Sequence, residues 1–159
     1  MTIEELEGYG LERMNAEEIE SFLDGQSHGV LGLPDDPAPY LLPLSYAFDG
    51  TYVYFTYLRG RESRKERLSD RADRATFLVY SVETMFNWRS VLLEGDIRAV
   101  PESRWSDLED VLADTWRPEL IRMASTERRM AIYRLRIDEQ SGLRHTGLSP
   151  EFTEPSTDD

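Results

Sequence analysis

The chain has 159 residues, of which 31 are acidic and 18 basic, and its net charge is −13. A nucleic-acid backbone would repel that charge, so general binding to DNA or RNA is not expected. No apolar run approaches the roughly 20 residues that cross a bilayer, and residues 1–24 lack the apolar region of a signal peptide. We therefore expect a cytoplasmic protein with no membrane partner.

Two features of the composition limit the chemistry further. Cysteine is absent, which excludes disulfides, thiolate nucleophiles, zinc fingers and iron–sulfur clusters. Lys65 is the only lysine, so the other 17 cations are arginine. Together with the acidic excess, this composition favours a halophilic protein, because screening over about 3 Å at molar ionic strength removes the self-repulsion. The alternative is an ordinary acidic cytosolic protein.

A single folded domain is expected over residues 15–148, since a chain with 40% apolar residues can build one core. Residues 1–14 are interpreted as an N-terminal extension. Residues 149–159 are interpreted as a flexible acidic tail, because Pro150–Asp159 carries four acids, two prolines and no cation.

The first half of the chain predicts one helix and three strands. Asn15 and Glu18 form a capping box, and apolar residues at helical spacing predict a helix from about Ala16 to Asp24, ended by Gly25. The strands are predicted over His28–Leu33, Tyr40–Phe48 and Thr51–Leu58. Alternation places Tyr40, Leu42, Leu44, Tyr46 and Phe48 on one face. Asp49-Gly50 is a hairpin signal, so the second and third strands are expected to pair antiparallel.

The second half predicts further strands and helices. A helix is expected from Ser63 to near Asp73, and another opens at Pro101. The second helix should bury Trp105, Leu108, Val111 and Leu112, and a shorter helical piece should follow over residues 118–123. Strands are predicted over Ala75–Val82, Trp88–Val100 and Ala131–Ile137. Gly95 is a candidate bulge, and Ser141-Gly142 is expected to turn the chain.

Strands arranged largely as hairpins, with short helices between them, are typical of a mainly β fold, an antiparallel barrel with α+β decoration. A βαβ dinucleotide fold is not expected, because no G-x-G-x-x-G follows a strand and no Walker loop is present.

A cationic island interrupts the acidic chain. Between Arg59 and Arg74 seven cations stand against four anions, a local charge of +3, which leaves −16 for the rest. Ser63 and Glu66 form a capping-box pattern, so a helix N-terminus should face these cations and favour a phosphate. The residues expected there are Arg61, Ser63, Arg64 and Lys65, with Thr56 on the preceding strand. The alternative is a solvated basic face paired with its own acids.

Several short stretches follow one another in a characteristic order. They are Gly29-Val30-Leu31, residues 39–44, Asp49-Gly50, residues 53–56, Gly60-Arg61, Ser63-Arg64-Lys65, residues 88–91 and Glu94-Gly95. Their order and spacing, from about Asn15 to Gly142, resemble the split-barrel flavin-binding family that includes pyridoxamine 5′-phosphate oxidase and the nitroimidazole-resistance proteins.

The resemblance implies a split β-barrel that binds FMN and forms a homodimer with two flavins at the interface. It implies that Arg64 and Lys65 hold the flavin phosphate, assisted by Arg61 and Ser63. Leu44, Ser45 and Tyr46 would lie against the isoalloxazine, and Thr56 and Tyr57 near the ribityl chain. The segment that crosses from the second subunit would be Trp88, Arg89 and Ser90.

Two departures from the family limit the activity. Residues 133–139 lack the histidine of the C-terminal motif with which pyridoxamine 5′-phosphate oxidases bind the substrate phosphate, so that activity is not expected. Thr56 stands where many nitroimidazole-resistance relatives have histidine. His28 and His145 have no located partner, so no catalytic residue is assigned, and no metal-ligand spacing occurs.

These observations predict an FMN-dependent oxidoreductase that exchanges hydride or electrons between a reduced nicotinamide and an unknown small acceptor. A variant would use the deazaflavin cofactor F420 on the same fold. The alternative of a different class is a non-catalytic flavin carrier or sensor, or a dimeric binding module without ligand.

Overall fold

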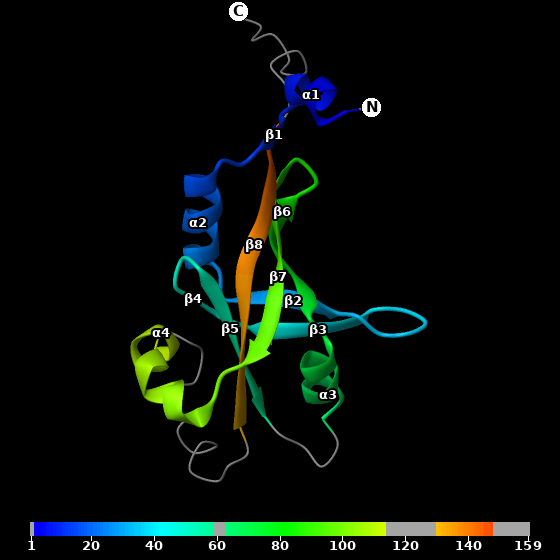
Figure 1. Ribbon diagram of the computed structural model, residues 1–159. Coiled ribbons are helices and arrows are strands. Elements are labelled where there is room, and N and C mark those ends of the chain that lie inside the picture. The colour runs from blue at the N-terminus through cyan, green and yellow to red at the C-terminus, as the bar shows by residue number, and fades with distance from the viewer. Residues whose placement is uncertain (1, 59–62, 114–129, 148–159) are drawn as a thin grey trace, which may run out of the picture.

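An antiparallel sheet dominates the computed structural model, which describes residues 2–58, 63–113 and 130–147. Its strands are β1 (Leu11–Arg13), β2 (His28–Leu33), β3 (Tyr40–Ser45), β4 (Ala47–Phe48), β5 (Tyr52–Leu58), β6 (Arg74–Thr84), β7 (Asn87–Ala99) and β8 (Met130–Thr146). Their order is β3-β2-β6-β7-β8-β5-β4, and β1 pairs with β8. The curled sheet confirms the predicted antiparallel barrel (Figure 1).

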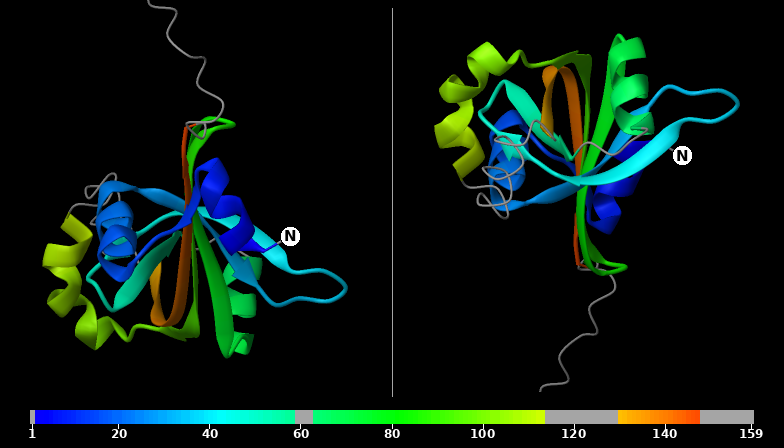
Figure 2. Two further views of the ribbon diagram at one scale, coloured as in Figure 1. Left: turned by 90° about the horizontal axis from the view of Figure 1, so that it is seen from above. Right: turned by 90° about the horizontal axis from the view of Figure 1, so that it is seen from below.

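Short helices decorate the sheet. They are α1 (Ile3–Leu6), α2 (Ala16–Gly25), α3 (Arg64–Arg71) and α4 (Glu109–Ala113), with 3₁₀ turns over Glu7–Tyr9 and Glu102–Leu108. Seen along the sheet, α2 and α4 lie on one side of β7 and β8, and α3 lies on the other (Figure 2). Among the described residues, no helix has the length and apolar character needed to span a membrane.

The predicted first helix is confirmed as α2. The Asn15 side chain accepts a hydrogen bond from the Glu18 N–H, and the Glu18 carboxylate accepts one from the Asn15 N–H, which completes the capping box. Ile19, Phe22 and Leu23 are buried against the sheet. The helix therefore forms because its cap and its apolar face agree.

The predicted pairing of the second and third strands is only partly correct. β3 pairs along its whole length with β2, and only Ala47 and Phe48 pair with β5. The change of partner occurs at Tyr46, whose ring is buried and whose hydroxyl donates to the Leu23 carbonyl at 2.6 Å. This anchor bends the strand between two partners, and residue alternation does not reveal such a bend.

The last strand is longer than predicted, and the expected turn at Ser141-Gly142 is wrong. Gly142 pairs with Val91 inside β8. A Cβ at Gly142 would lie 2.9 Å from the Met14 Cβ, and the Met14 N–H donates to the Gly142 carbonyl at 2.8 Å. The glycine therefore permits a close approach between chain segments within a continuous strand.

Gly95 marks the predicted bulge. The register of β7 with β8 shifts between Glu94 and Gly95, and a Cβ at Gly95 would lie 1.6 Å from the Arg136 carbonyl oxygen. Only a residue without a side chain allows the two strands to approach this closely.

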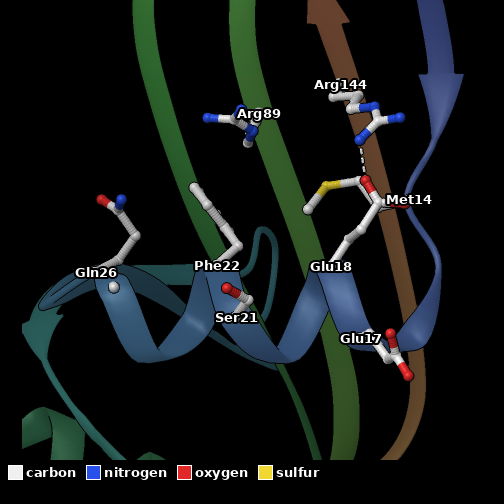
Figure 3. A pocket seen from close by; sticks show the side chains of 9 residues that line it. Met14, Glu17, Glu18, Ser21, Phe22, Gln26, Arg89 and Arg144 are labelled. Atoms are coloured by element: carbon white, nitrogen blue, oxygen red, sulfur yellow. Dashed lines mark hydrogen bonds and ion pairs between the residues drawn. The ribbon is translucent and has the colours of Figure 1, made fainter.

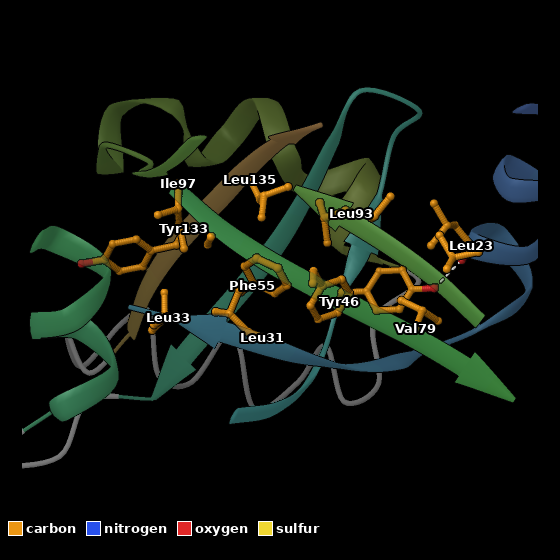
Figure 4. Packing of buried hydrophobic residues seen from close by; sticks show 14 of the residues in the cluster. Leu23, Leu31, Leu33, Tyr46, Phe55, Val79, Leu93, Ile97, Tyr133 and Leu135 are labelled. Carbon is orange, nitrogen blue, oxygen red and sulfur yellow. Dashed lines mark hydrogen bonds between the residues drawn. The ribbon is translucent and has the colours of Figure 1, made fainter. Parts of the chain in front are cut away.

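The main core fills the inside of the curled sheet, where large buried side chains from β2, β5, β6, β7 and β8 meet (Figure 4). The predicted inner face of Tyr40, Leu42, Leu44, Tyr46 and Phe48 contributes to this core. A second cluster lies under α4 and contains the predicted Trp105, Leu108, Val111 and Leu112. The predicted piece over residues 118–123 and the acidic tail lie outside the described residues.

Candidate functional site

The sheet is open along one line, here called the seam. It consists of the free edge of β3 and the part of β5 from Phe55 to Leu58. β3 and β4 are the two ends of the strand order, and the pairing of β4 with β5 stops at Tyr54. β3 and β5 run in different directions beyond this pairing (Figure 1). Backbone N–H and C=O groups on these edges are therefore not used by the sheet.

Helix α3 is fastened beside the seam by buried groups. Leu68 and Ser69 are buried, and the Ser69 Oγ donates to the Lys65 carbonyl at 2.6 Å. The Tyr57 hydroxyl lies 2.9 Å from the Ser69 Oγ, and the Tyr133 hydroxyl donates to the Asp70 carboxylate at 2.6 Å. Burial raises the pKa of Tyr57 to about 12. These contacts fix the helix against the rings of two core tyrosines, which stack at 4.8 Å.

The first turn of α3 carries the predicted phosphate residues. The Ser63 side chain accepts from the Glu66 N–H and caps the helix, as predicted. The Arg64 guanidinium donates to Asp35 at 2.7 Å, which lowers the pKa of that carboxyl, and it covers the Tyr40 ring at 4.4 Å. Arg61 lies outside the described residues.

Lys65 differs from Arg64 in its surroundings. Its Nζ lies 5.7 Å from the centre of the Tyr57 ring, and its side chain is half-buried. No carboxylate in the described part of the chain forms an ion pair with Lys65. The ammonium group is therefore an uncompensated cation beside the seam.

The predicted flavin-binding residues of the β3–β4 segment and of β5 are divided between the two faces of the sheet. The side chains of Leu44, Tyr46 and Tyr57 contribute to the inner core, so only their backbone atoms can meet a ligand outside the barrel. Alternation places Ser45 and Thr56 on the outer face.

Sequence reasoning missed two apolar residues on these outer faces. Leu41 shares its face with Ser45 and is 63% exposed, and Leu58 shares its face with Thr56 and is 54% exposed. The alternation of each strand could have located them, because the core-facing residues were already assigned. They give the seam an apolar surface.

The segment Trp88–Ser90 lies at the other end of the sheet from α3. Near α3, the Ile97 N–H donates to the Asp73 carbonyl at 3.2 Å. Ile97 lies eight positions along β7 from Arg89, which corresponds to roughly 26 Å. Within one chain, the two groups of predicted residues are therefore far apart.

An apolar patch runs along the outer face of the sheet from the neighbourhood of Trp88 to β3. Its exposed members are Leu41, Tyr80, Val82 and Leu92, from β3, β6 and β7. A groove of about 530 Å³ runs beside them and is lined by Val30 and Leu78 among others. Exposed apolar patches of this kind mark interaction surfaces.

Each of the two histidines contacts a residue of its own neighbourhood. The His28 ring lies 2.7 Å from the Ser27 hydroxyl, and the His145 Nδ1 lies 2.8 Å from the Phe86 carbonyl oxygen. Among the residues described, no group of three or more acidic or histidine side chains is arranged to hold a metal ion.

Comparison with known proteins identifies the fold independently. The chain shares its architecture with a FAD-binding protein from Mesorhizobium loti (TM-score 0.70, 19% identity, 87% of this chain and 98% of that one). The FAD and heme binding protein from Mycobacterium smegmatis gives a TM-score of 0.69 at 16% identity, covering 88% of this chain and 75% of that one.

A protein assigned to 5-nitroimidazole antibiotic resistance, from Bacteroides thetaiotaomicron, gives a TM-score of 0.63 at 15% identity, covering 86% of this chain and 90% of that one. Identities this low establish the fold alone. A search of curated proteins gives no significant match.

A family model described as pyridoxamine 5′-phosphate oxidase matches residues 15–144, which is most of the chain. The match spans the opening helix α2, the seam, α3 and nearly all of β8. By this match, the chain belongs to the pyridoxamine 5′-phosphate oxidase family.

Proposed function

We propose that this protein is a flavin-dependent oxidoreductase that holds FMN along the seam. The observation that carries the proposal is Lys65, an uncompensated cation in the first turn of α3, beside the open edge of a sheet in a chain of charge −13. A cation at a helix N-terminus attracts a phosphate group. The flavin-binding relatives with the same fold support the same proposal.

The residues of the seam fit a flavin nucleotide. Leu41 and Leu58 offer apolar contact to a flat ring, and the free strand edges offer backbone donors and acceptors to its polar rim. Ser45 and Thr56 add hydroxyl groups on the outer face, where the ring and the ribityl chain would lie. Leu44, Tyr46 and Tyr57 would contribute through their backbone.

At the phosphate end, Lys65 would bind directly, with the Ser63 cap and Arg61 nearby. Arg64 would have to exchange Asp35 for the phosphate, because its guanidinium is already engaged. We therefore expect Lys65 to contribute more to phosphate binding than Arg64.

A bound flavin supplies the hydride and electron chemistry of such enzymes. The protein's own residues then bind and orient the cofactor, and no side chain of the seam is required as an acid or base. We propose a reduced nicotinamide as the donor and a small molecule as the acceptor.

We further propose a homodimer in which a second copy completes the site. The segment Trp88–Ser90 lies about 26 Å along β7 from α3, so Trp88 and Ser90 can approach the phosphate end only from another subunit, whereas Arg89 faces α2 on the other side of the strand. The apolar patch of Leu41, Tyr80, Val82 and Leu92 offers the surface for this contact.

Cofactor retention and turnover separate this function from its alternatives. Protein desalted from excess FMN should stay yellow, and reduced nicotinamide should bleach it in a turnover assay. Retention without bleaching by any reduced nicotinamide would favour a carrier or sensor. Retention of the deazaflavin cofactor in place of FMN would favour the deazaflavin variant, and loss of both cofactors on desalting would refute flavin binding. FAD is tested in parallel, because it has a second phosphate and an adenine for which we assign no site.

A further inference from the structure

A second cleft lies away from the seam, between α2 and the strands β7 and β8 (Figure 3). It has a volume of about 510 Å³. Met14 and Phe22 form an apolar floor, each only 8% exposed. Arg89 and Arg144 line it from the strands, and Ser21 and Gln26 line it from the helix. The cleft thus combines an apolar surface with several hydrogen-bond donors.

The two arginines of the cleft stand directly opposite each other on neighbouring strands. Like charges in this cross-strand position repel. The charge of Arg144 is compensated, because its guanidinium binds the carboxylate of Glu12 at 2.7 Å and also that of Glu18. These two carboxylates raise the pKa of Arg144 and hold its side chain in place.

Arg89 has no such compensation. No carboxylate or other side chain in the described ranges forms an ion pair or hydrogen bond with its guanidinium. Its planar group of N–H donors is therefore free to bind an anion in a bidentate manner.

The acidic residues of the lining limit the charge of that anion. Glu18 is occupied by Arg144, and Glu17 lies at the far end of the helix face, pointing away from Arg89 (Figure 3). A dianionic phosphate would be repelled by these carboxylates more strongly than a monoanion. The apolar floor favours a ligand with a flat apolar body, because Phe22 can contact a ring.

We propose that this cleft binds a small aromatic carboxylate, with its carboxylate on Arg89 and its ring over Phe22 and Met14. The Gln26 amide and the Ser21 hydroxyl lie on the helix side of the cleft, where they can donate to the second edge of the ligand. This site is separate from the seam and does not rest on flavin binding.

The test uses benzoate as the probe and the full-length chain without added flavin. Binding is measured by calorimetry, and its location by NMR shifts of the Gln26 side-chain amide and the Phe22 backbone amide. Benzoate should bind and shift these signals. Benzamide, which has the same shape without the charge, and inorganic phosphate should both bind at least about tenfold more weakly.

Three variants place the interaction. Arg89→Gln should weaken benzoate binding by about 10- to 100-fold, as expected for loss of a bidentate charged contact. Arg98→Gln is the control, because Arg98 is an exposed arginine of the same strand outside the cleft. Ser21→Trp places a large side chain on an exposed helix position and should block the cleft without disturbing the core.

The proposal is overturned if benzoate fails to bind, if benzamide or phosphate binds as tightly, or if Arg89→Gln and Arg98→Gln have equal effects. Full binding to Ser21→Trp would also overturn it, because the ligand would then lie elsewhere.

Discussion

Helix α3 is held against the barrel by the hydrogen bond from the Tyr133 hydroxyl to Asp70, and Tyr133→Phe removes it. A bond to a charged acceptor is worth roughly 1.5–3 kcal/mol, but Asp70 is exposed and water can replace the lost partner. The phenylalanine keeps the ring stacked on Tyr57 at 4.8 Å. We therefore expect the free energy of unfolding to fall by about 1 kcal/mol, measured by urea denaturation.

The control for this change is Tyr52→Phe, since Tyr52 is a half-buried tyrosine whose ring lies under Arg134. It should change the unfolding free energy by less than about 0.5 kcal/mol. Amide exchange should also become faster in α3 of Tyr133→Phe and stay unchanged in α2. Equal unfolding energies for the two variants would refute the role of the Tyr133 hydroxyl as a tether.

Three further predictions concern the stability of the fold. Gly95→Ala should lower the free energy of unfolding by about 3 kcal/mol or prevent folding, because the new Cβ would overlap the Arg136 carbonyl. Gly32→Ala is the control: its Cβ has 3.6 Å of clearance, so the free energy of unfolding measured in urea should change by less than about 1 kcal/mol. The pKa of Tyr57 is raised from about 10 to about 12, so the contribution of its neutral hydroxyl to the stability of the fold is complete below pH 10 and is lost as the pH rises to 12. A free energy of unfolding that stays constant across this range in alkaline denaturation would contradict the burial of Tyr57. Raising the ionic strength from about 0.1 M to 1 M shortens the screening length from roughly 10 to 3 Å, so the urea midpoint should rise, and a falling midpoint would argue against self-repulsion.

Local patterns predicted most of the elements because each depends on neighbouring residues. The capping box at Asn15, the strand over His28–Leu33 and the bulge at Gly95 are examples, and the structure agrees with them. The failures involve distant contacts. The chain changes its strand partner at Tyr46, whose hydroxyl reaches the Leu23 carbonyl. Gly142 lies inside a continuous strand, where its lack of a side chain makes room for Met14. Neither contact leaves a signal in the residues beside it.

The candidate site was predictable in position but not in detail. The cationic island correctly placed a capped helix after Ser63. The sequence could not show that Asp35, 29 residues earlier, occupies the Arg64 guanidinium while Lys65 has no such partner. Nor could a match to family segments separate the inward side chain of Tyr57 from the outward one of Thr56, although strand alternation could have done so.

The most direct test of flavin nucleotide binding at α3 compares FMN with riboflavin, which lacks the phosphate. Dissociation constants are measured by flavin fluorescence for the unmodified protein, for Lys65→Gln and for Arg67→Gln, an exposed position on the same helix. Lys65→Gln should weaken the binding of FMN by about 10- to 100-fold and change the dissociation constant of riboflavin by less than about twofold. Arg67→Gln should affect the binding of neither ligand. Equal losses of FMN and riboflavin in Lys65→Gln, or unchanged binding of both, would contradict a phosphate site at the start of this helix.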